Sequence, residues 1–127
     1  MKYLKRFNES VDESNIEEIK QTIKDILLPI SDMGYEISVT DDVDFNGELT
    51  GVIIRVVSYT DTPLKMNDEV TDEFIRMKEY LESSGFNSVE SIYVREGSNY
   101  RFEEDFNEFI ILEEVILRNL LFVAKVN

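Results

Sequence analysis

The most regular pattern in the chain is an apolar stripe at helical spacing over residues 16–30. Ile and Leu recur there at intervals of three, four or one residue, which predicts a helix with one buried side. Ser14 and Glu17 form an S-x-x-E capping box at its start. Because Pro29 has no N–H, we expect a kink or a tightened turn there, and Gly34 is placed to end the helix in the left-handed conformation.

Residues 35–40 alternate between apolar and polar side chains, which predicts a half-buried strand. The dipeptide Asn46-Gly47 then predicts a hairpin with a type I′ turn, because both central residues of such a turn need a positive φ. The return strand is expected over residues 49–59, and its many Val and Ile residues indicate that both of its faces are partly covered.

A second helix is expected after the loop that contains Pro63, with Asn67 or Asp68 as its N-cap and Gly85 as its end. Its inner stripe, at helical spacing, consists of Val70, Phe74, Met77 and Leu81. The side chains of this helix that we expect mostly to face water are Asp72, Glu73, Arg76, Glu79 and Glu82.

The rest of the chain predicts two further strands. Ile92 and Val94 mark the first, and alternation over residues 117–126 marks the second. Residues 100–114 mix aromatic, aliphatic and acidic side chains, so this segment fits either a helix or a strand. A repeat is visible as well, because a glycine and an aromatic residue follow each helix, as Gly34-Tyr35 and again 51 residues later as Gly85-Phe86.

These elements predict an α+β fold: a two-layer αββαββ arrangement with a four-stranded, mainly antiparallel sheet and two helices on one face. Residues 14–127 are expected to form a single domain of two αββ half-repeats, at about 14–60 and 67–126. Residues 1–13 have no sustained period and are expected to form a flexible basic and polar arm.

The composition lowers the expectation of catalysis. The chain of 127 residues contains neither Cys nor His, so thiolate nucleophiles, disulfides and imidazole acid–base chemistry are excluded. No signature of a phosphate-binding or dinucleotide-binding loop is present, and we expect no cofactor. No apolar segment is long enough to cross a membrane and the N-terminus has no secretory signal, so we expect a cytoplasmic protein that does not contact membranes.

Charge separates the arm from the rest of the chain. The formal net charge is −14, which disfavours direct binding to nucleic acid. Three basic residues lie in the first six positions, so residues 7–127 carry 10 basic and 27 acidic residues, a net charge of −17. The arm is a short basic and apolar peptide that could dock on an acidic protein partner or on its own acidic domain. Its candidate contact residues are Lys2, Tyr3, Leu4, Lys5, Arg6 and Phe7.

One segment resembles part of a calcium loop. Asp42, Asp44 and Asn46 match positions one, three and five of the D-x-D-x-N-G opening, and Gly47 matches the sharp turn. Position twelve, which should be a bidentate Glu, is Ile53. A polar hairpin turn is therefore the favoured interpretation, and the three oxygen-bearing side chains are kept as candidate metal ligands.

Acidic residues also gather in the segment that fits either a helix or a strand. A pair of these carboxylates could serve magnesium-dependent or carboxylate-pair hydrolysis. Their spacing is not specific for such a site, so a solvated acidic surface is the favoured interpretation. The residues concerned are Glu103, Glu104, Asp105, Glu108, Glu113 and Glu114.

The N-terminal segment Met1-Lys2-Tyr3-Leu4-Lys5-Arg6-Phe7-Asn8-Glu9 resembles the Lys- and Phe-containing start of small proteins of large tailed bacteriophages. Residues 23–37 resemble a helix-to-strand segment of some of these proteins. The resemblance implies a phage protein that could be carried in the virion, because such N-terminal peptides direct proteins into the assembling head and are cut after a Glu. Cleavage between Glu9 and Ser10 would fit, although Phe7 departs from the usual Leu or Ile.

Three hypotheses of function follow. The first is a phage-encoded, non-enzymatic protein that acts by protein–protein interaction through its arm and one face of the sheet, in the host cytoplasm or in the virion. The second is an acidic DNA mimic that inhibits a nucleic-acid-binding protein of the host. The third is an enzyme that depends on carboxylates and a metal ion. The sequence leaves the partner and a homo-oligomeric state open.

Overall fold

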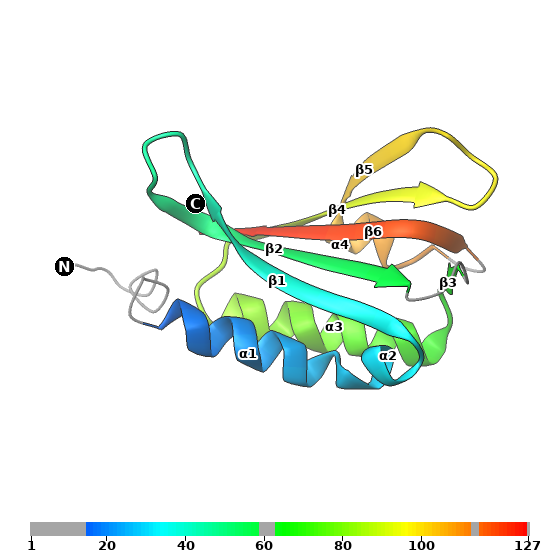
Figure 1. Cartoon of the computed structure of the whole chain (residues 1–127), viewed down its shortest axis with the longest axis horizontal. Helices are drawn as coiled ribbons and strands as arrows, with labels where there is room; N and C mark the ends of the chain where they lie inside the picture. Colours follow the sequence, from blue (N-terminus) through cyan, green and yellow to red (C-terminus); the bar gives the residue numbers. More distant parts are fainter. Residues whose placement is uncertain (1–14, 59–62, 113–114, 127) are drawn as a thin grey trace.

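Two layers form the structure, a computed structural model that describes residues 15–58, 63–112 and 115–126. An antiparallel sheet forms one layer, and the helices pack on one of its faces (Figure 1). The elements are, in chain order, α1 (Ile16–Ile26), α2 (Leu28–Asp32), β1 (Tyr35–Val43), β2 (Leu49–Ser58), β3 (Leu64–Lys65), α3 (Asp68–Ser83), β4 (Ser88–Arg95), β5 (Arg101–Asp105), α4 (Phe106–Phe109) and β6 (Ile116–Lys125).

The predicted α+β class and antiparallel sheet are confirmed, but the predicted count of four strands is wrong. The described residues form a six-stranded sheet in the order β1-β2-β6-β4-β5, with the short strand β3 also paired to β6. The four strands that the periodicity predicts are β1, β2, β4 and β6, which are neighbours in space in the order β1-β2-β6-β4. The additional strands are β3, which has two residues, and β5 at the edge.

The predicted count of two helices is wrong as well, since four occur in the described part of the chain. One cause is Pro29, which lies in the first turn of α2. Because proline lacks an N–H, it suits the start of a helix better than its interior. The predicted single helix therefore divides at Leu27 into α1 and α2. The N-cap of α1 is Asn15, one residue later than the capping box predicts, and Ser14 lies outside the described residues.

The predicted ends of α3 are confirmed. The side chain of Asn67 accepts a hydrogen bond from the backbone N–H of Val70 at 3.0 Å, which caps the first turn. At the other end Gly85 has a φ of 109°, and the N–H of Phe86 bonds to the carbonyl of Leu81 at 3.0 Å. This pattern satisfies the last carbonyls of the helix and turns the chain directly into β4.

One prediction for α3 is wrong, and it concerns the exposure of Glu73. The sequence predicts that Glu73 mostly faces water, but this residue is only 8% exposed. The carboxylate pairs with Arg76 Nη1 at 2.9 Å. Burial is tolerated because a charged partner lies one helical turn away.

The β1–β2 hairpin forms with a different turn from the predicted type I′ turn. The N–H of Gly47 bonds to the carbonyl of Asp44 at 2.9 Å, so the central residues are Phe45 and Asn46, and Gly47 follows with a φ of 83°. The carboxylate of Asp44 accepts the N–H groups of Asn46 and Glu48 at 2.8 and 3.0 Å. These side-chain bonds favour a three-residue loop with the glycine in third place.

Both alternatives for residues 100–114 occur in succession. Residues Arg101–Asp105 form β5, which pairs with β4, and the single turn α4 follows directly. The carboxylate of Asp105 accepts the N–H of Asn107 at 3.0 Å. An acidic side chain at the end of the strand thus caps the start of the turn.

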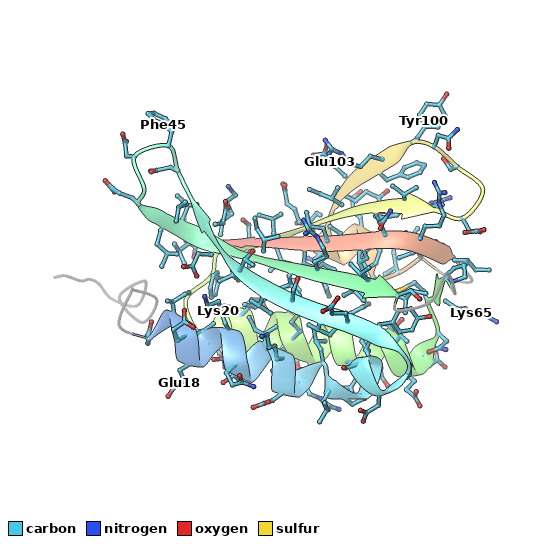
Figure 2. The ribbon with its side chains drawn as sticks, viewed as in Figure 1. Glu18, Lys20, Phe45, Lys65, Tyr100 and Glu103 are labelled. Carbon is cyan, nitrogen blue, oxygen red and sulfur yellow. The ribbon has the colours of Figure 1, made fainter. Side chains whose placement is uncertain are left out.

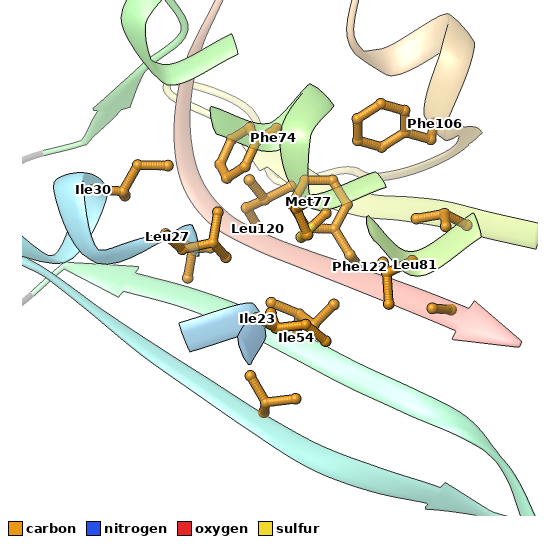
Figure 3. Packing of buried hydrophobic residues seen from close by; sticks show 14 of the residues in the cluster. Ile23, Leu27, Ile30, Ile54, Phe74, Met77, Leu81, Phe106, Leu120 and Phe122 are labelled. Atoms are coloured by element: carbon orange, nitrogen blue, oxygen red, sulfur yellow. The ribbon is translucent and has the colours of Figure 1, made fainter. Parts of the chain in front are cut away.

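The core lies between the helices and the sheet (Figure 3). Phe122 on β6 is fully buried, and its ring lies 5.0 Å from that of Phe74, 5.7 Å from that of Phe106 and 5.6 Å from that of Phe109. The predicted stripes of α1 and α3 point into this cluster, since Ile23, Leu27, Ile30, Phe74, Met77 and Leu81 are all fully buried. Helix α4 packs on the same face as α1 and α3, because its two Phe rings meet Phe122.

We predict that Gly51→Ala destabilises the protein by about 1–3 kcal/mol, because a Cβ at this position would overlap the backbone carbonyl of Ala124 on β6. Urea unfolding followed by circular dichroism measures the change. Thr40→Ala, on the exposed side of β1, is the control and should cost less than about 0.5 kcal/mol. Equal stability of the Gly51→Ala variant and the wild type would contradict the close approach of β2 and β6.

Candidate functional site

The face of the sheet opposite the helices is the candidate functional site, and we call it the open face. Side chains alternate along each strand, so the residues between the buried ones point to this side. None of the described helices covers it (Figure 1). Its residues are Glu36, Ser38, Thr40 and Asp42 on β1; Gly51, Ile53, Arg55 and Val57 on β2; Asn119, Leu121, Val123 and Lys125 on β6; Ser88, Glu90, Ile92 and Val94 on β4; and Arg101, Glu103 and Asp105 on β5.

The middle of the open face is apolar. Strand register places the side chains in rows across the sheet, and in one row Arg55, Leu121 and Ile92 are neighbours. The next row contains Ile53 and Val123. We call the six aliphatic residues of the three central strands the apolar strip. All six are only half-buried, and none belongs to the core cluster or packs against it: Ile53, Val57, Ile92, Val94, Leu121 and Val123.

Charged residues of both signs surround the apolar strip. Lys125 Nζ lies 3.3 Å from Asp42 Oδ2, and Arg101 Nη2 lies 3.5 Å from Glu103 Oε2. Glu90 and Asp105 are direct cross-strand partners on this face, and two like charges in such a position repel each other. The open face therefore has six aliphatic residues on its central strands and charged residues beside and between them, and we call these charged residues the rim.

Two hairpin tips extend the open face with exposed aromatic rings. Phe45, at the tip of the β1–β2 hairpin, is 97% exposed, and Tyr100, between β4 and β5, is 78% exposed. Figure 2 shows both side chains at opposite ends of the molecule, on the side of the sheet away from α1 and α3. Single exposed rings of this kind are common on protein surfaces, so the apolar strip remains the main feature of the open face.

A pocket of about 250 Å³ opens on this face between Arg55 and Arg101. The side chains of Ile92, Val94 and Leu121 contribute its apolar part, and Asn119 adds an amide. The two guanidinium groups come from β2 and β5, which β6 and β4 separate. Only the pairing of four strands brings these residues together.

A larger hollow of about 580 Å³ lies beside β3 and the start of α3. It contains one cation, Lys65, and one carboxylate, Asp68, so its charges offset each other. The exposed Ile111 also lines it. Because one charge of each sign lines it, this hollow presents no net charge to a ligand.

The structure gives no support to the calcium-loop hypothesis. The Asp44 carboxylate accepts two backbone N–H groups of its own turn, and the Asp42 carboxylate pairs with Lys125. Asn46 is one of the two exposed central residues of that turn. Within the described residues, no group of three or more Asp, Glu, His or Cys side chains is placed to hold a metal ion.

The acidic residues after Tyr100 do not converge either. Glu103 and Asp105 point to the open face, whereas Glu104 points to the other side and accepts a hydrogen bond from the Tyr93 hydroxyl at 2.7 Å. Glu108 is exposed on α4. Glu113, Glu114 and the candidate arm residues from Lys2 to Phe7 lie outside the described residues.

Arg55 and Arg101 were missed as candidate site residues. Neither arginine belongs to a recognisable sequence motif. Only the register of the strands shows that they share a pocket. One signal was present, because Ile92 and Val94 mark β4 by their alternation, yet the buried side of that strand is formed by Val89, Ser91 and Tyr93. The apolar residues that reveal this strand therefore belong to its uncovered side.

No family model, curated protein or solved structure matches this chain. None of the helices in the described segments is long and apolar enough to span a membrane. The function of this protein is therefore inferred from the residues of the open face.

We predict that the free energy of unfolding falls as the pH rises above about 10, and that Tyr93→Phe reduces this dependence. Burial raises the pKa of Tyr93, and its hydrogen bond to Glu104 raises that pKa further. The unfolded chain therefore loses the phenolic proton first as the pH rises, which favours unfolding.

Urea unfolding between pH 8 and 11 measures this dependence. Part of it remains in Tyr93→Phe, because burial also raises the pKa of Tyr35. The control is Tyr100→Phe, which makes the same change at an exposed position. An unchanged dependence in Tyr93→Phe would contradict the prediction.

Proposed function

We propose that this chain is a non-catalytic protein that acts by contact with a protein partner, and that the open face is its contact surface. The observation that carries the proposal is the apolar strip, whose six side chains are half-exposed although the helices bury the other side of the same strands. Burial of such a strip by a partner is favourable by roughly 25 cal/mol for each Å² removed from water. Exposed apolar patches with polar rims mark interaction sites.

The rim favours a protein over a nucleic acid or a lipid surface. It includes the carboxylates of Glu36, Glu90 and Asp105 as well as the cations of Arg55 and Arg101. Both phosphate backbones and anionic membranes would be repelled by the net charge of −14. A protein surface can instead present charges of both signs and an apolar centre.

The N-terminal arm is proposed as a second contact region. Its basic residues Lys2, Lys5 and Arg6 alternate with apolar side chains, and they would attract an acidic surface. Phage origin and a place in the virion rest on the resemblance of the first nine residues and of residues 23–37. They are kept as part of the same proposal.

One observation favours a second candidate, the acidic DNA mimic. Helices α1, α2 and α3 carry ten acidic and four basic residues. Lys20, Arg76 and Lys78 each pair with a neighbouring carboxylate, which reduces the field of this layer. Capture of basic nucleic-acid-binding proteins that weakens steeply with added salt would favour the mimic over the open-face proposal.

We predict that Leu121→Glu weakens partner binding at least tenfold, because it places a charge in the middle of the apolar strip. The matched control is Leu28→Glu, which makes the same change at a 54% exposed position of α2 in the helix layer. A protein captured by the wild type and by Leu28→Glu, but lost with Leu121→Glu, is purified. Its affinity for the three chains is then measured by calorimetry.

Equal affinity of Leu121→Glu and the wild type for every captured protein would rule out the open face as the contact surface. Circular dichroism and thermal unfolding check that the variants are folded. A deletion of residues 1–9 tests the arm separately. We expect that the partner protein, or the phage virion, then retains less of the shortened protein than of the wild type.

A further inference from the structure

The pocket between Arg55 and Arg101 combines two cations with an apolar floor. The cross-strand neighbours of the floor are direct: Ile92 pairs with Leu121, and Val94 pairs with Asn119. Arg55 is the neighbour of Leu121 on one side, and Arg101 is the neighbour of Val94 on the other. The two arginines and Asn119 thus line, together with the aliphatic floor, a pocket of about 250 Å³.

The positive charge of this pocket is poorly compensated by the protein itself. Arg55 has no ion pair with any carboxylate of the described residues, although the chain has 27 acidic and 13 basic residues. Arg101 pairs with Glu103 at 3.5 Å, whereas the other ion pairs of the described residues measure 2.7 to 3.3 Å. Both side chains are exposed, so their donors are available to an anion.

We infer that this pocket binds the C-terminal carboxylate of a partner polypeptide whose last residue is aliphatic. The inference rests on the proposed function, because the pocket is part of the open face. Guanidinium groups are the preferred partners of carboxylates, since they donate two parallel hydrogen bonds. The aliphatic floor then receives the side chain of the same terminal residue, and the Asn119 amide can bond to its peptide group.

A terminal carboxylate fits the pocket better than the carboxylate of an internal Asp or Glu. A C-terminal Leu, Ile or Val presents an anion and a branched aliphatic group on one residue. An internal acidic side chain brings the anion alone and leaves Ile92, Val94 and Leu121 without an apolar partner. The volume of about 250 Å³ lies below the usual range for drug-sized ligands, which suits one residue of a chain.

Three peptides test the inference on the full-length chain by nuclear magnetic resonance. The first is acetyl-Ala-Ala-Leu with a free carboxylate, and the second is the same peptide with a C-terminal amide. The third, acetyl-Ala-Leu-Glu-amide, carries an aliphatic residue and an internal carboxylate. We expect the first to shift the amide signals of Ile92, Val94 and Leu121 with a Kd of about 1 mM. Both amidated peptides should bind at least tenfold more weakly.

Variants of the two arginines locate the binding site. Arg55→Gln and Arg101→Gln should each weaken binding of the free-acid peptide by about tenfold, since each removes a charge-assisted hydrogen bond at an exposed position. Lys24→Gln, on the exposed side of α1, removes the same charge elsewhere and should leave binding unchanged. Binding should also weaken between 0.05 and 0.5 M salt, values chosen to span about 14 to 4 Å of screening length.

The inference is overturned if the free-acid and amidated peptides bind equally, if none of them shifts the pocket signals, or if Arg55→Gln binds as the wild type does. Tight binding of the Glu-containing amide would also overturn the inference, because the pocket would then bind an internal carboxylate and not a terminal one. The proposed function has a separate outcome. A partner lost with Leu121→Glu but retained by Arg55→Gln and Arg101→Gln would keep the open face as the contact surface and remove the pocket from it.

Discussion

Pairing of β6 with both β2 and β4 is the interaction on which the rest of the structure depends. The strands β1 and β2 come from the first half of the chain, and β4 and β5 from the second, so these two hairpins meet only through β6. Six residue pairs join β6 to β2, from Gly51–Lys125 to Val56–Leu120. The same strand brings Phe122 into contact with rings from α3 and α4. Sheet and core are therefore completed by one segment.

The two sides of β6 have different roles because its side chains alternate. Leu120, Phe122 and Ala124 are buried under the helices, whereas Leu121 and Val123 lie on the open face. A side of a sheet that is left uncovered is usually polar, and here six residues of its three central strands are aliphatic. The half-exposed aliphatic residues in its middle add nothing to the described core. The proposed contact with a protein partner would account for their presence there.

Local patterns in the sequence predict the elements of this fold better than their pairing. The stripes of α1 and α3, the cap at Asn67 and the glycine at the end of α3 follow from neighbouring residues alone. Residues 100–114 fit either a helix or a strand because they mix apolar with acidic side chains. The strand β5 forms at their start, where β4 offers a free edge. The turn at Asp44 depends on side-chain hydrogen bonds that a dipeptide signal does not contain. Arg55 and Arg101 are 46 positions apart, so only tertiary structure brings them to one pocket.

The central position of β6 also determines when the sheet can be completed during synthesis of the chain. β6 is synthesised after every other strand of the sheet, and until it leaves the ribosome the inner edges of β2 and β4 have no partner. An unpaired strand edge rich in Val and Ile invites association with other chains. The inner edges of β2 and β4 can be paired only after β6 has been synthesised, so the open face exists only once this last strand lies between them.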